Sequence, residues 1–135
     1  MATSKIQQLT HAYFEHKIWR NELELARQEA SFFLKILDEY KVKTLSQPHN
    51  SLVVAEFVNQ FHHFQRLVKR LLLEMQGIDK EMAQGVISDN IFDKDQKKDH
   101  LYFNDEMKYF ETDYRETKYR FRRFIASFEN PVTLN

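Results

Sequence analysis

The chain has 135 residues, enough for one domain with a sizeable apolar core. Apolar residues make up 42% and charged residues 30%, a balance that argues against a disordered or membrane-embedded chain. Twenty basic residues balance twenty acidic ones and cysteine is absent, so net charge indicates no nucleic-acid or membrane partner, and thiol nucleophiles, iron–sulfur clusters and cysteine-ligated zinc are excluded.

The first residues and the apolar runs bear on location. The opening Met-Ala-Thr-Ser-Lys-Ile-Gln-Gln lacks the apolar centre of a signal peptide, and no apolar run approaches the roughly 18 residues of a membrane span. We therefore expect a cytoplasmic protein without membrane association. Only two Gly and two Pro occur, and helix interiors disfavour both. This scarcity predicts long, uninterrupted helices in a single all-α domain over residues 1–135.

The first helix is expected over about residues 4–43. Ser4 and Gln7 have the spacing of a capping box, in which each side chain accepts from the other residue's backbone N–H. Seam residues then recur at alternating steps of three and four, the heptad pattern of a helix packed lengthwise on its neighbours. They are Leu9, Ala12, His16, Trp19, Leu23, Ala26, Ala30, Phe33, Leu37 and Tyr40.

Two further helices follow at the same rhythm. The second is expected over residues 48–77, with Pro48 in its first turn and Gly77 as a C-terminal glycine cap. A single helical turn over 79–84 would separate it from the third, which we expect over about 89–128 with Ser88 as N-cap. Charged residues crowd 93–99, so the sequence does not define the residue at which the third helix starts.

Three long helices with short connections predict an up-down-up antiparallel bundle with coiled-coil-like packing. The first helix also carries a second apolar stripe, outside the seam, made of Phe14, Ile18, Leu25, Phe32 and Ile36. A wide internal core would explain this stripe. The other explanation is an interface, with a second copy of the chain completing the bundle as a homodimer.

Two seam histidines, His16 and His100, are expected near the same end of the bundle, close to Met75. Bundles build metal sites from inward-facing side chains on different helices, and imidazole binds zinc and iron. Glu74 and Asp99 are candidate carboxylates nearby. The alternative is a pair of histidines at the edge of the core that hydrogen-bond to neighbouring side chains.

His16-Lys-Ile-Trp19, followed by Leu23, resembles the His-x-x-Trp opening of the chemoreceptor zinc-binding domains. Those domains are helical bundles that hold zinc through three His and one Cys, so the resemblance implies a zinc role for His16. The chain departs from the pattern, because it has no Cys and no later His-x-x-x-His pair.

The end of the third helix is rich in cations interleaved with aromatic rings, a pattern suited to single-stranded nucleic acid. The candidate contacts are Arg115, Lys118, Arg120, Arg122 and Arg123. Cations near a helix C-terminus also stabilise its dipole, and because the net charge is zero we do not expect nucleic-acid binding.

The sequence contains no phosphate-binding glycine loop, no Gly-x-Ser-x-Gly elbow and no kinase motifs. We therefore expect a non-enzymatic helical bundle without a cofactor that acts by self-association and protein–protein interaction. A metal-binding bundle and a nucleic-acid binder are the alternatives.

Overall fold

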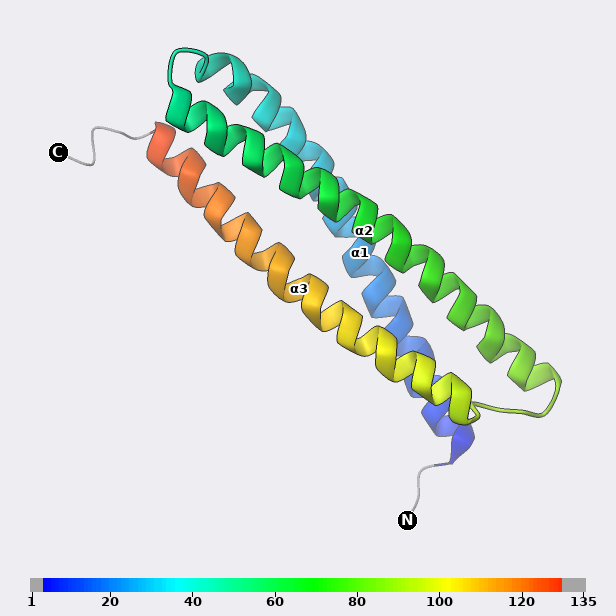
Figure 1. The fold of residues 1–135 in the computed structure, drawn as a ribbon. Helices are drawn as coiled ribbons and strands as arrows, with labels where there is room; N and C mark the ends of the chain where they lie inside the picture. The colour runs from blue at the N-terminus through cyan, green and yellow to red at the C-terminus, as the bar shows by residue number, and fades with distance from the viewer. Residues whose placement is uncertain (1–3, 130–135) are drawn as a thin grey trace.

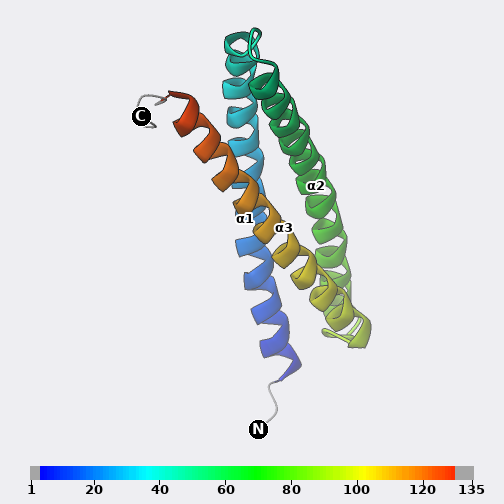
Figure 2. The same ribbon diagram turned by 60° about the vertical axis from the view of Figure 1, so that its left-hand side comes forward.

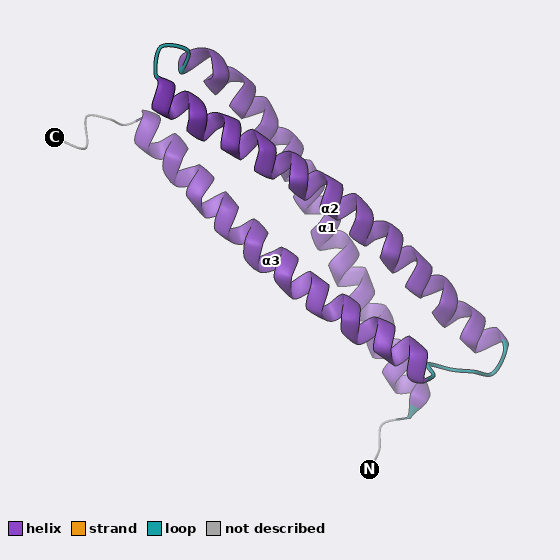
Figure 3. Cartoon of the chain, in the orientation of Figure 1, coloured by secondary structure: helices purple, strands orange, loops and turns teal. Residues whose placement is uncertain are grey.

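The chain folds into three long helices in the computed structural model, which describes residues 4–129 (Figures 1 and 3). They are α1 (Lys5–Lys43), α2 (Pro48–Ile87) and α3 (Lys94–Glu129). None of the residues from 4 to 129 lies in a strand, which confirms the all-α prediction. At 36 to 40 residues, each helix is about 54–60 Å long.

The helices run up, down and up. α2 returns alongside α1, and α3 lies across the pair with its C-terminal end near the α1–α2 connection (Figures 1 and 2). Large rings fill the space between the three helices. Phe33 of α1, Phe61 of α2 and Phe121 of α3 meet with ring centroids 5.0 to 5.3 Å apart. Aromatic pairs at this distance add specific edge and tilted contacts to the area that they bury.

The predicted seams form the core. In α1, the buried residues Ala12, Trp19, Leu23 and Leu37 follow the alternating steps of three and four that the sequence showed. In α2 and α3, the buried positions continue the same rhythm through Phe61 and Phe103, both fully enclosed. Along the described part of the chain, no helix has the length and apolarity needed to cross a membrane.

The start of α1 and the start of α2 have the local chemistry that the sequence predicted. Ser4 Oγ accepts from the backbone N–H of Gln7 at 3.1 Å, and Gln7 Oε1 accepts from the Ser4 N–H at 3.1 Å. This reciprocal pair confirms the capping box. Pro48 occupies the first turn of α2, where its missing N–H costs no helical hydrogen bond.

The second helix is longer than predicted, because Gly77 does not end it. α2 continues without a break to Ile87, and residues 79–84 belong to it rather than to a separate turn. Ile78 and Met82 extend the buried seam beyond Gly77. Their burial outweighs the roughly 1 kcal/mol by which a glycine weakens a helix interior.

The third helix begins later than predicted, at Lys94 rather than near residue 89. Ser88 ends α2 instead of capping α3. Asp93 occupies the N-cap role, since its Oδ1 accepts from the backbone N–H of Gln96 at 2.9 Å. The intervening loop includes Asp89 and Phe92 at positive φ (62° and 45°), and the Phe92 ring is buried.

Candidate functional site

The structure brings His16 of α1 and His100 of α3 into direct contact. His16 Nε2 lies 2.9 Å from His100 Nδ1, a hydrogen-bond distance between two imidazole rings. His16 is only 1% exposed, and Trp19 packs against both rings at centroid distances of 5.4 Å. The sequence predicted only that these two histidines would lie near the same end of the bundle. In the structure they are in direct hydrogen-bonding contact.

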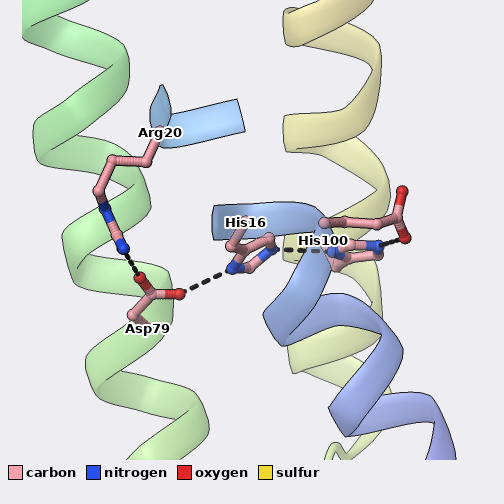
Figure 4. A network of polar contacts seen from close by, with 5 residues as sticks. His16, Arg20, Asp79 and His100 are labelled. Carbon is pink, nitrogen blue, oxygen red and sulfur yellow. Dashed lines mark hydrogen bonds and ion pairs between the residues drawn. The ribbon is translucent and has the colours of Figure 1, made fainter. Parts of the chain in front are cut away.

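Carboxylates stand at both ends of the histidine pair. His16 Nδ1 lies 2.7 Å from Asp79 Oδ1 of α2, and His100 Nε2 lies 3.3 Å from Glu15 Oε1 of α1. Arg20 donates to the second oxygen of Asp79 at 2.5 Å (Figure 4). The result is a polar chain that crosses all three helices at one level of the bundle.

The contact between the two rings limits how they can be protonated. A hydrogen bond between His16 Nε2 and His100 Nδ1 needs a proton on one of these nitrogens and a lone pair on the other. Asp79 and Glu15 place acceptor oxygens at the two outer nitrogens of the pair.

Full protonation of both rings is unfavourable. Protonating every ring nitrogen would set one N–H against another across the 2.9 Å contact. Burial lowers the pKa of His100 below its ordinary value, and the neighbouring charge of His16 lowers it further. Glu15 opposes both effects but does not outweigh them.

The two histidines were also the candidate metal ligands. Among residues 4–129, no group of three or more His, Cys, Asp or Glu side chains has the arrangement to hold a metal ion. The carboxylates that the sequence suggested lie elsewhere, since Glu74 pairs with Arg70 and Asp99 neighbours Glu81. The site as built is a hydrogen-bonded histidine pair at the edge of the core.

Sequence reasoning missed the acidic partner of His16. Asp79 lies one helical turn beyond Met75, which was expected at the level of His16. Ending the second helix at Gly77 placed Asp79 in a separate segment and hid this relationship. Continuing the seam rhythm through Ile78 would have revealed it.

The second apolar stripe of α1 lies largely on the surface. Phe14, Ile18, Leu25 and Phe32 are 55–60% exposed. Ile36 differs from them, because it is partly buried against the core. A wide internal core therefore does not account for the first four residues. We call the set Phe14, Ile18, Leu25, Phe32 and Ile36 the outer stripe.

A groove between α1 and α3 runs beside the middle of the outer stripe. Leu25, Glu22 and Glu111 line it together with cations of α3. The groove holds two carboxyl groups close to each other, since Glu22 hydrogen-bonds to Glu111. Partial burial and the Glu111 carboxyl together raise the pKa of Glu22 to about 7. No cation of the described chain neutralises this pair by an ion pair.

The five candidate nucleic-acid contacts do not form one surface. Arg115, Lys118 and Arg122 line the α1–α3 groove, whereas Arg120 lines a groove between α2 and α3. Lys118 forms an ion pair with Glu29 of α1, with Nζ 2.9 Å from Oε2. Arg123 lies over the Tyr119 ring on α3 itself, 5.6 Å from its centroid.

Comparison with known proteins adds no relative. No protein-family model matches the chain, and no curated protein or solved structure matches it.

Proposed function

We propose that this chain is a non-enzymatic self-association module that forms a homodimer through the outer stripe of α1. The observation that carries the proposal is the exposure of four large apolar side chains in a row on one helix face. Phe14 and Phe32 are 18 residues apart, so this exposed row is about 27 Å long. Ile18, Leu25 and Phe32 recur every seven residues, the spacing of a helix face that packs lengthwise on a second helix.

Two exposed leucines of α2 are more widely spaced than the members of this row. On α2, Leu52 and Leu73 are 60% exposed but 21 residues apart, which separates them by about 32 Å along the helix. Isolated apolar side chains of this kind are normal on protein surfaces. The row on α1 is also continuous with a groove that carries charges of both signs, as interface rims commonly do.

The histidine cluster supports a structural rather than a catalytic reading. His16 is enclosed, and each of its ring nitrogens already contacts another side chain. A general base must instead present an available nitrogen to the substrate. The cluster ties the three helices together at one level of the bundle.

The test is the oligomeric state of the full chain, measured by sedimentation over a range of concentrations. We expect the wild type to form a dimer and Leu25→Lys to sediment as a monomer. Leu73→Lys on α2 is the matched control, because Leu73 is equally exposed, and it should remain dimeric. Circular dichroism confirms that each variant keeps its helices. A wild type that stays monomeric at high concentration would overturn the proposal.

A further inference from the structure

The outer stripe has a spacing that is symmetric about its centre. Ile18 and Phe32 each lie seven residues from Leu25, and Phe14 and Ile36 each lie eleven residues from it. These offsets correspond to about 10 Å and 16 Å along the helix axis. Turning α1 end for end about Leu25 therefore keeps Leu25 at its own height and exchanges the heights of the other members in pairs.

We propose that the second copy packs antiparallel on α1, related by a twofold axis that passes beside Leu25. This inference rests on the proposed self-association and adds its geometry. Leu25 meets Leu25 of the partner copy, Ile18 meets the partner's Phe32, and Phe14 meets the partner's Ile36. An isologous contact of this type closes on itself and leaves no stripe uncovered.

Charges beside the stripe favour this direction. The Tyr114 hydroxyl donates to the Ala26 carbonyl at 3.2 Å, which sets α3 at the height of Leu25 on its own α1. Arg115 follows Tyr114 and lines the same groove as Glu22 and Glu111. The groove thus has an unneutralised carboxyl pair and a cation that forms no ion pair within the described chain. Near a twofold axis, each cation can neutralise the carboxyl pair of the other copy.

Only the antiparallel arrangement makes this exchange possible. α3 lies on one side of the outer stripe, where Glu15 and Glu29 of α1 contact it. A twofold axis perpendicular to α1 places the α3 helices of both copies on the same side of the α1 pair. A twofold axis parallel to α1 would place them on opposite sides, with Arg115 far from the partner's Glu111.

Cysteine cross-linking tests the direction cleanly, because the chain has no cysteine of its own. We expect Leu25→Cys to form a covalent dimer on mild oxidation or with a short bis-maleimide, since Leu25 lies beside the twofold axis. Ile18→Cys should not cross-link to itself, because the two sites are about 21 Å apart in the antiparallel pair. An equimolar mixture of Ile18→Cys and Phe32→Cys should cross-link.

The outcomes separate this inference from the function on which it rests. Self-cross-linking of Ile18→Cys would show a parallel pair, which overturns the antiparallel direction and leaves self-association intact. A dimer in sedimentation in which neither Leu25→Cys nor the Ile18→Cys and Phe32→Cys mixture cross-links would show that another face is used. That result overturns the outer stripe as the interface. A monomer overturns both proposals.

A charge exchange tests the groove independently. Arg115→Glu and Glu111→Arg should each weaken dimerisation several-fold, because each sets like charges across the twofold axis. Mixing the two variants restores opposite charges at both symmetric contacts, and the doubly exchanged chain does the same in a homodimer. Recovery of dimerisation in the double variant supports the antiparallel contact. Additive weakening would contradict it.

Discussion

His16 Nε2 and His100 Nδ1 lie 2.9 Å apart, although 84 residues separate them in the chain. The contact joins α1 to α3, and Asp79 joins the same ring of His16 to α2. One polar chain therefore sets the height of all three helices relative to one another. Apolar seams with a regular repeat favour several registers almost equally, whereas a buried hydrogen-bonded pair favours one.

Replacing His16 should destabilise the fold. His16→Ala opens a cavity in an enclosed site and removes the hydrogen bonds to Asp79 and His100. We expect a loss of about 2–4 kcal/mol in the free energy of unfolding, measured by urea titration. His62→Ala is the control, because His62 is exposed and should change stability by less than about 0.5 kcal/mol. Equal effects of the two substitutions would contradict the role of the pair.

The His100 pKa predicts a pH dependence of stability. The pKa is lowered in the folded protein, so the unfolded chain takes up this proton first as the pH falls through about 6.5. Proton uptake by the unfolded state lowers stability, and the loss grows until the pH reaches the folded pKa. We therefore expect stability to fall between about pH 7 and pH 5 more steeply in the wild type than in His100→Gln.

The comparison with a variant matters because Glu22 acts in the opposite direction. Its raised pKa lets the folded state hold a proton at a pH where the unfolded state has released it. Both proteins in the comparison retain Glu22, so its contribution cancels in the difference. His49→Gln, at an exposed position, should follow the wild type. Parallel curves for the wild type and His100→Gln would contradict the prediction.

The Tyr114 hydroxyl should contribute measurably to the α1–α3 contact. Its one proton faces two acceptors, the Ala26 carbonyl oxygen at 3.2 Å and Glu29 Oε1 at 3.1 Å, in a buried position. We expect Tyr114→Phe to reduce the free energy of unfolding by about 1–2 kcal/mol. Tyr109→Phe is the matched control, since Tyr109 is 70% exposed. If Tyr114→Phe left the free energy of unfolding unchanged, the hydrogen bonds of the hydroxyl would be no stronger than its hydration in the unfolded chain.

The two glycines of α2 should respond oppositely to alanine. A Cβ at Gly77 would meet no atom within 4 Å, so Gly77→Ala should stabilise the helix by about 0.5–1 kcal/mol. A Cβ at Gly85 would lie 2.5 Å from Gln96 Nε2 and 2.6 Å from the Asn90 carbonyl oxygen. Gly85→Ala should therefore destabilise by about 1–3 kcal/mol, because the α2–α3 loop must move. Thermal unfolding of both variants checks the difference in sign.

Much of the fold was determined locally and was therefore predictable from the sequence. The repeat of three and four identifies which side chains of a helix face the core, because the helix period itself sets that face. Ser4, Gln7 and Pro48 act within one turn of their own position, so their roles were also predictable. The nearness of His16 and His100 followed from counting along helices of known rise.

Tertiary structure decided the rest, where distant residues compete with a local preference. Gly77 has the local signature of a helix end, but burial of Ile78 and Met82 outside that local window carries α2 to Ile87. The same extension places Asp79 beside His16, a contact that no local rule contains. The sequence alone also could not determine whether the outer stripe is buried or exposed. Whether an apolar helix face is covered depends on where the other helices pack, because burial is a property of the assembled bundle.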